Sequence, residues 1–164
     1  MFATIFLMFP CMAFAQEPPV QSPPLAVTLF FEENGDLKGE TASLPSGTFV
    51  EDNVKAVFDR LAEGSQTLGA VLPKTAKLET VLIGEDKTVY LSFNEAFLAD
   101  FPGGITQEIL TASAICQTVF ANFDFPAMQL LVKGKELKTL AGHVDVESPI
   151  NRAQCGTLAK YKRE

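Results

Sequence analysis

The spacing of apolar residues predicts an amphipathic helix in the segment "EDNVKAVFDRLAEGS". Its apolar positions follow the i, i+3, i+4, i+7 pattern of one helix face: Val54, Val57, Phe58 and Leu61. Glu51 and Asp52 lie at its start, where negative side chains interact favourably with the positive end of the helix dipole. Gly64 lies at the position where a helix commonly ends.

A second helix is expected after the turn sequence "FPGG". Thr106 is a suitable N-cap. Glu108 would interact favourably with the positive end of the helix dipole. The apolar positions again form one stripe: Ile109, Ala112, Cys116, Val119 and Phe123. Pro126 follows the end of this stripe, where a helix is expected to stop.

The remaining segments predict strands joined by tight turns. "VTLFFEENGDLKGETASL" pairs two extended stretches across Asn34-Gly35, a strong hairpin signal. "LETVLIGEDKTVYLSFNEAF" turns at residues 84–87, and its return strand alternates apolar and polar positions, as expected when one face is buried. "AMQLLVKGKELKTL" is expected to turn at Gly134-Lys135.

This order of elements predicts the fold class. Strand pairs joined by tight turns favour an antiparallel sheet, and two amphipathic helices need a common apolar surface. We therefore expect an α+β fold, a two-layer sandwich with both helices on one face of the sheet, in the order β(β)-α-β-β-α-β(β). The domain would span residues 25–152, followed by a C-terminal tail over 153–164.

The first residues indicate export. Residues 1–15 form an uncharged apolar run that ends in Ala13-Phe14-Ala15, the A-x-A pattern of a secretory signal peptide. Residues 16–24, "QEPPVQSPP", form a proline-rich linker. Cys11 follows Phe9-Pro10 and lacks the small residues expected before a lipidated cysteine. We expect a protein of the periplasm or cell envelope, without a stable membrane span after cleavage.

The charge excludes one class of partner. The chain of 164 residues has a net charge of −7, and an acidic domain repels nucleic-acid backbones and anionic lipids. The short basic run of Lys160, Lys162 and Arg163 does not change this balance. Nucleic acid is therefore not expected as a partner.

The segment "GHVDVESPINR" contains the only histidine of the chain. His143, Asp145 and Glu147 would lie on one face of a strand, about 6.6–6.8 Å apart at their Cβ atoms. A transition-metal ion holds its ligands at about 2.0–2.2 Å, so the three could converge only after severe bending. We expect neither a metal nor a cofactor there. His143 is expected to have a structural role. Its replacement by alanine should therefore lower the free energy of unfolding by an amount on the order of 1 kcal/mol.

The same segment does not predict catalysis. The chain has no G-x-S-x-G motif, and a Cys-His dyad would need His143 beside a cysteine at an unknown distance. Two cysteines remain after cleavage, Cys116 and Cys155. Both interpretations of this pair stay open: a disulfide, or a core thiol at Cys116.

Several segments together resemble one known family. "LVKGKELKTLAGHVDVESPINR" is similar to the closing motif of GerMN domains, the module named from spore-germination proteins. "AVFDRLAEGS", "LGAVLPKTAKLETVLIGEDKTVYLSFNEAF" and "ASAICQTVFANFDFPAMQLLVKG" resemble earlier family segments in the same order, so that the match spans about residues 27–152. The positions that match the closing motif are Gly134, Leu140, Gly142, His143, Pro149 and Arg152.

The sequence also departs from the family pattern. Ser65 stands where a proline is usual, Lys74-Thr75 replaces Gly-Thr, and Cys116 replaces an apolar residue. The resemblance implies a small exported α+β module without established catalytic residues. It also implies a fold similar to ring-building motifs, which assemble side by side in envelope structures. A single copy behind a signal peptide does not by itself imply a role in sporulation.

Two functional classes follow. The first is a non-enzymatic module that contacts an envelope protein, or another copy of itself, through a sheet edge, a helix face or the linker. The alternative is a domain that binds a small molecule or a glycan such as peptidoglycan. Phe97, Phe101 and Phe125 flank the second helix. They would either form an exposed interaction patch or cap the ends of the core.

Overall fold

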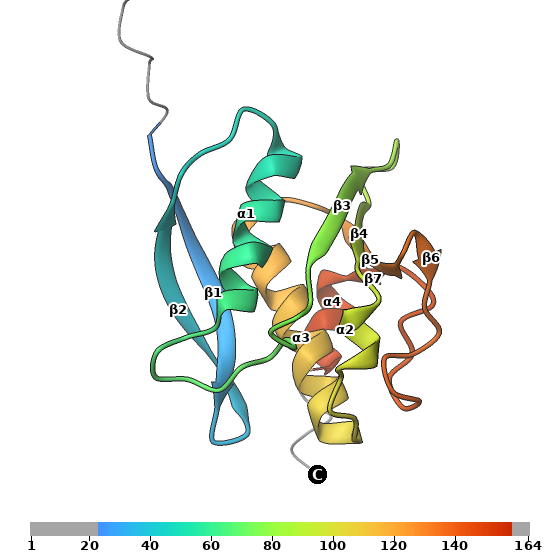
Figure 1. Cartoon of the computed structure of the whole chain (residues 1–164). Coiled ribbons are helices and arrows are strands. Elements are labelled where there is room, and N and C mark those ends of the chain that lie inside the picture. Colours follow the sequence, from blue (N-terminus) through green and yellow to red (C-terminus); the bar gives the residue numbers. More distant parts are fainter. Residues whose placement is uncertain (1–22, 159–164) are drawn as a thin grey trace, which may run out of the picture.

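The structure is a computed structural model that describes residues 23–158. The expected signal peptide, Cys11, most of the linker and the basic run at 160–163 lie outside the described residues. The elements (Figure 1) follow in the order β1 (Leu25–Glu33), β2 (Asp36–Leu44), α1 (Val50–Glu63), β3 (Leu78–Ile83), β4 (Val89–Phe93), α2 (Ala96–Ala99), α3 (Ile105–Asn122), β5 (Ala127–Val132), β6 (Lys135–Glu136), β7 (Ile150–Asn151) and α4 (Arg152–Leu158).

The first two strands form a hairpin of their own. β1 and β2 pair antiparallel from Leu25 with Leu44 to Glu33 with Asp36. Asn34 and Gly35 both have positive φ, 52° and 84°, as the expected two-residue turn requires. The hairpin does not join the second sheet within the described part of the chain.

The second sheet contains antiparallel and parallel pairs. Its strand order is β3-β4-β5-β6, and β7 pairs with β5. β4 and β5 run parallel because helices α2 and α3 connect them, and a crossover of this kind returns the chain in the same direction. The α+β class is confirmed, whereas the sheet differs from the all-antiparallel arrangement that the tight turns favoured.

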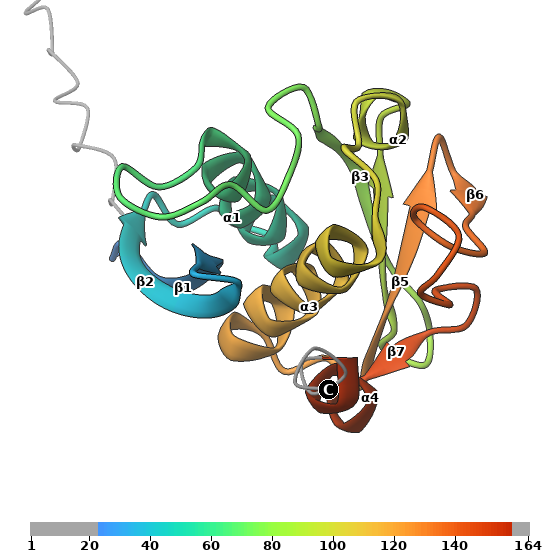
Figure 2. The same cartoon turned by 90° about the horizontal axis from the view of Figure 1, so that it is seen from below.

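The two long helices, α1 and α3, lie between the two sheets (Figure 2). α3 packs against β1, and α1 packs against both β1 and β3. Every position of α3 from Glu108 to Phe120 except Gln117 is buried. Most of these buried side chains are apolar or small, which suits such a central place. The sequence predicted two layers, a sheet and its helices. The β1-β2 hairpin forms a third layer on the other side of these helices.

Local details agree with the expectations to within a few residues. α1 buries the four predicted residues, Val54, Val57, Phe58 and Leu61. α3 begins at Ile105, so Thr106 lies inside the helix and Gly104 occupies the cap position. The third turn lies at Lys133-Gly134, one residue earlier than expected. α4 includes residues 153–158, which the sequence assigned to a tail.

No helix in the described range is long and apolar enough to cross a membrane.

Candidate functional site

A buried carboxylate organises the loop between β6 and β7. Glu108 lies in the first turn of α3, and its side chain is 0% exposed. Its two oxygens accept hydrogen bonds from four backbone N–H groups and one imidazole. The Oε1 donors are the N–H groups of Leu140 (3.0 Å), Ala141 (2.9 Å) and Val144 (3.0 Å), and the Oε2 donors are the N–H and the Nδ1 of His143 (both 3.0 Å).

These contacts determine the charge of Glu108 and the tautomer of His143. Burial raises the pKa of the Glu108 carboxyl, but hydrogen bonds from Ala141, Val144 and His143 outweigh it and hold the pKa below its ordinary value of 4.5. An ionised carboxylate only accepts hydrogen bonds, so the proton of a neutral His143 lies on Nδ1. Nε2 is then an acceptor on a side chain that is 47% exposed.

The loop is bent, which corrects the expected strand over 143–147. Thr139 and Asp145 form an isolated antiparallel bridge, and Val144 and Val146 point inward as predicted. Asp145 Oδ1 accepts the N–H of Glu147 at 2.9 Å. Within residues 23–158, no group of three or more His, Cys, Asp or Glu side chains could hold a metal ion.

Two further features hold the loop in place. Gly142 has a φ of 101°, which favours glycine, and its N–H donates to Thr139 Oγ1 at 2.9 Å. Gln129 on β5 is buried, and its Nε2 donates to the carbonyls of Val146 (2.9 Å) and Glu147 (3.1 Å). Glu108 thus holds the Leu-x-Gly-His segment from the core, and Gln129 holds the residues that follow it, Val146 and Glu147.

Arg152 of the family motif caps the C-terminal end of α3. Its Nη1 donates to the carbonyl of Phe120 at 2.6 Å, and its Nη2 donates to the carbonyl of Phe123 at 2.9 Å. The guanidinium also lies over the Phe120 ring, 5.0 Å from its centre. A cation at this end satisfies carbonyls that have no partner within the helix and complements the helix dipole. Of the remaining motif positions, Gly134 supplies the left-handed turn before β6, Leu140 is buried and Pro149 is exposed.

The two cysteines of the domain form a disulfide in the structure. Cys116 on α3 and Cys155 on α4 are both buried, with their Cα atoms 5.9 Å apart. The bond attaches α4 to the central helix. Neither sulfur is therefore a free thiol, and a Cys-His dyad with His143 is excluded for this oxidised state.

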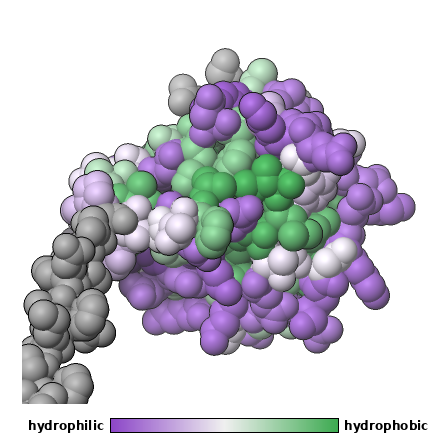
Figure 3. Space-filling view, turned by 90° about the horizontal axis from the view of Figure 1, so that it is seen from above, coloured by the Kyte–Doolittle hydropathy of each residue, from purple (hydrophilic) through white to green (hydrophobic). Residues whose placement is uncertain are grey.

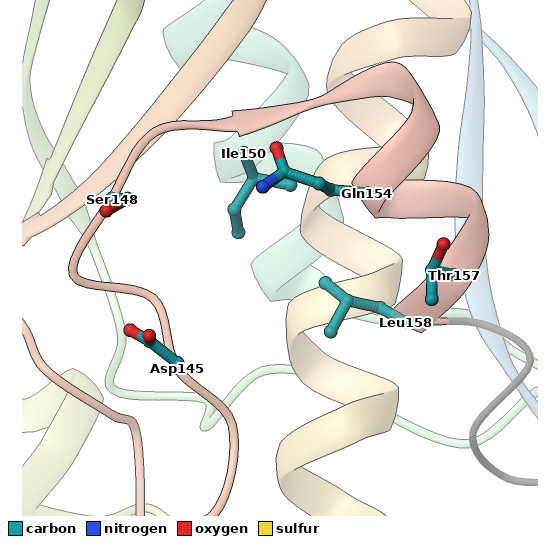
Figure 4. A pocket seen from close by; sticks show the side chains of 6 residues that line it. All are labelled: Asp145, Ser148, Ile150, Gln154, Thr157 and Leu158. Atoms are coloured by element: carbon teal, nitrogen blue, oxygen red, sulfur yellow. The ribbon is translucent and has the colours of Figure 1, made fainter.

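Two adjoining hollows lie beside the loop. One of about 390 Å³ is lined by Ile105, Ile109, His143, Val144, Asp145 and Leu158. The other, of about 280 Å³, lies between the loop and α4 (Figure 4) and is lined by Asp145, Ser148, Ile150, Gln154, Thr157 and Leu158. Both combine apolar walls with polar groups. Among the described residues, no hydrogen bond connects His143 to a hydroxyl or thiol that could serve as a nucleophile.

Of the two alternatives for Phe97, Phe101 and Phe125, the burial of Phe97 and Phe125 agrees with core residues and not with an exposed patch. Phe97 is fully buried and stacks on Phe93, with the ring centres 4.4 Å apart. Phe125 is buried beside Phe123, and Phe101 is half-buried. Phe97 and Phe125 therefore belong to the core, because the short helix α2 and the turn before β5 direct them inward.

Other apolar side chains are exposed instead. Phe49, immediately before α1, is 67% exposed, and Leu82, near the end of β3, is 58% exposed. Val50 at the start of α1 is exposed as well. The start of α1 and the end of β3 lie at the top of Figure 1, and the view from above in Figure 3 shows apolar residues surrounded by hydrophilic ones. We call Phe49, Val50 and Leu82 the upper patch.

Comparisons with known proteins agree on one family. Residues 28–138 match the family model described as Germane, sporulation and spore germination. The first GerMN domain of the sporulation protein GerM from Bacillus subtilis is similar at 18% identity and a TM-score of 0.64, over 80% of this chain and 99% of that domain. The tandem GerMN domains of the same protein match at 19% identity and a TM-score of 0.57, over 85% of this chain and 48% of the tandem.

A Clostridium perfringens protein described as a lipoprotein has the same fold. It matches at 20% identity and a TM-score of 0.57, over 80% of this chain and 89% of that one. At such identities the likeness concerns the fold alone. No curated protein matches the sequence.

Proposed function

The chain belongs to the Germane family of sporulation and spore germination domains, and from this we propose that it is an exported, non-enzymatic module that acts by contact with a cell-envelope protein. The side chains best suited to chemistry already have structural partners. Glu108 and His143 Nδ1 hold the loop, and Cys116 and Cys155 are bonded to each other. A contact function needs none of these groups to react.

The upper patch is the observation that supports this proposal. Burial of a large exposed apolar side chain such as Phe49 under a partner is favourable, because apolar surface leaves water, and binding energy concentrates in a few such residues. The hydrophilic surroundings seen in Figure 3 are typical of the rim of a protein interface. Phe49 and Leu82 are therefore the proposed anchors.

Three observations support export to the cell envelope. The buried disulfide between Cys116 and Cys155 suits an oxidising compartment outside the cytoplasm. The residues 1–15 have the pattern of a cleaved signal peptide. A protein of the same fold from Clostridium perfringens is described as a lipoprotein, which also favours an envelope location.

The proposal is tested by cross-linking and capture from envelope extracts with the exported chain. Phe49→Asp combined with Leu82→Asp should greatly reduce capture of the specific partner, while circular dichroism stays native. Gln66→Asp combined with Thr67→Asp is the matched control, because it adds the same charge at two exposed positions outside the upper patch and outside the hollows beside His143. Unchanged capture by the double variant, or turnover of peptidoglycan or ester substrates by the wild-type protein, would contradict the proposal.

A second candidate function is ligand binding in the hollows beside His143. The observation in its favour is a hollow of about 390 Å³ where the imidazole and the Asp145 carboxylate adjoin the apolar side chains of Ile109 and Leu158. A sugar hydroxyl or an amide N–H could donate to His143 Nε2. Titration calorimetry with soluble peptidoglycan fragments tests this function. Binding that His143→Phe abolishes would support it, and absence of heat at saturating fragment would remove it.

A further inference from the structure

The outer edge of β1 is closed by side chains of the central helix and by the backbone of Gly69. The two-residue turn makes Glu33 and Asp36 a hydrogen-bonded pair, so that Thr28, Phe30 and Glu32 direct their backbone groups away from β2. The following contacts satisfy them: Thr28 N–H to Asn122 Oδ1 at 2.7 Å, Asn122 Nδ2 to Thr28 O at 2.7 Å, Phe30 N–H to Thr118 Oγ1 at 3.3 Å, and a mutual pair between Glu32 and Gly69 at 3.0 and 2.7 Å.

The outer edge of β2 has no such cover. By the same register, Leu37, Gly39, Thr41 and Ser43 direct their backbone groups outward, and none of these groups hydrogen-bonds to another described residue on that side. The strand is nine residues long and lies at the outside of the molecule (Figures 1 and 2). A long open edge of this kind is a template for pairing with another strand.

The other free edges of strands are shorter or interrupted. β3 has six residues and a register shift between Leu78 and Thr80, and Lys55 Nζ lies 3.5 Å from the carbonyl of Glu79. β6 has two residues. Bulges and lysine side chains are common devices that prevent edge pairing. Among the described strands, β2 therefore offers the longest regular edge.

The charges along β2 are complementary to those of a second copy of β2 that pairs with it antiparallel. When two copies pair antiparallel about Gly39, Lys38 of each copy lies opposite Glu40 of the other. Pairing about residue 38 would instead place two lysines opposite each other, and pairing about residue 40 would oppose two glutamates. Gly39 has no side chain to obstruct its own copy, and Leu37 would lie opposite Thr41.

Lys38 can exchange its present ion-pair partner for Glu40 of a second copy, and Glu40 is already held in place to receive it. Lys38 Nζ contacts Glu33 Oε1 at 2.7 Å, and both side chains are exposed, so water and salt weaken this pair. Glu40 is fixed by Ser65 Oγ at 2.7 Å and faces Arg60 at 3.5 Å. It is therefore held in position on the strand.

We propose that two copies of the chain associate along β2, antiparallel and centred on Gly39, to form a continuous four-stranded sheet of the two hairpins. The contact is distinct from the upper patch and goes beyond the proposed function. A dimer would present two upper patches to envelope partners, which raises the apparent affinity for a partner with repeated sites.

Sedimentation of the mature chain over a concentration series tests the dimer. The wild-type protein should show a reversible monomer–dimer equilibrium. Lys38→Glu should raise the dissociation constant by about tenfold or more, because two like-charged contacts replace two attractive ones. Thr41→Pro should abolish association, because it removes an outward N–H and leaves the β1-β2 ladder intact. Lys135→Glu makes the same charge change on the exposed strand β6 and should have no effect.

Cross-linking tests the register. A carbodiimide joins a lysine to a carboxylate in contact, and an equal mixture of ¹⁴N- and ¹⁵N-labelled chains should yield a Lys38–Glu40 cross-link of mixed isotope composition. The intramolecular pair of Lys133 and Glu79, 3.3 Å apart, is the internal control. A monomer at every concentration, or a dimer that neither Lys38→Glu nor Thr41→Pro weakens, would overturn the proposal. Capture of the envelope partner by Lys38→Glu monomers would still support the upper patch, so the two proposals can fail separately.

Discussion

Glu108 Oε2 accepts a hydrogen bond from His143 Nδ1 at 3.0 Å, although the two residues lie 35 positions apart in the chain. The carboxylate is buried and the imidazole is half exposed, so the pair connects the core to the surface of the loop. The backbone N–H of the same histidine also donates to Oε2, at 3.0 Å. The loop therefore depends on Glu108 more than on the His143 side chain.

This asymmetry leads to the first prediction. Glu108→Gln should lower the free energy of unfolding by about 2–3 kcal/mol, because its amide NH₂ faces N–H donors that need an acceptor. His143→Ala should cost about 1 kcal/mol, since the buried carboxylate keeps its four backbone donors. Urea unfolding followed by circular dichroism measures both values. Equal losses in the two variants would contradict this account of the loop.

The lowered pKa of Glu108 predicts acid sensitivity. A carboxyl group whose pKa is lower in the folded state contributes stability above its ordinary pKa, here 4.5. That contribution disappears as the pH falls through the lower pKa of the folded state. Unfolding free energies of the wild type should therefore decline below about pH 4.5 more steeply than those of Glu108→Gln. Parallel pH profiles of the two proteins would show that other carboxylates cause the decline.

The disulfide predicts a large effect of reduction. Cys116 and Cys155 are 39 residues apart, and closing a loop of this length stabilises a fold by about 4 kcal/mol in the chain-entropy estimate. Cys155→Ser should lose an amount in that range, and dithiothreitol should lower the stability of the wild type but not of the variant. Hydrogen exchange should increase first in α4. Equal stability of the reduced and oxidised wild type would exclude this role.

Arg152 provides a test of charge against geometry. Arg152→Lys keeps the positive charge but cannot donate to two carbonyls in the same planar arrangement or stack on Phe120 in the same way. We expect a loss of about 1 kcal/mol for Arg152→Lys and about 2 kcal/mol for Arg152→Ala, measured by thermal unfolding. Lys138→Ala, at an exposed loop position, is the control. A fully stable Arg152→Lys variant would reduce the role of Arg152 to its charge.

Export remains a prediction of the sequence. Cleavage after Ala15 should produce a protein in the extracytoplasmic fraction that begins at Gln16, as intact mass spectrometry can measure. Ala13→Asp combined with Ala15→Asp should block cleavage. A lipid adduct on Cys11, or a full-length protein in the cytoplasm, would contradict this prediction.

The sequence by itself determined the local elements. The α1 stripe and the Asn34-Gly35 turn could be predicted because helical periodicity and positive φ depend on residues a few positions apart. The inward direction of Val144 and Val146 followed from simple alternation. The order of strand pairs and helices along the chain likewise predicted the α+β class.

Only the tertiary structure decided how these elements meet. The sequence indicated only that Glu108 interacts with the helix dipole. In the structure its carboxylate oxygens accept hydrogen bonds from the N–H groups of a loop that lies 32 to 36 residues later in the chain. The signal that could have indicated this is an acidic residue directly before a run of small and apolar side chains, because a buried charge needs several hydrogen-bond donors. The parallel pairing of β4 with β5, the closed edge of β1 and the open edge of β2 likewise depend on how distant segments pack around α3. Periodicity specifies which residues become buried, but long-range packing and hydrogen bonding select the partner that covers them.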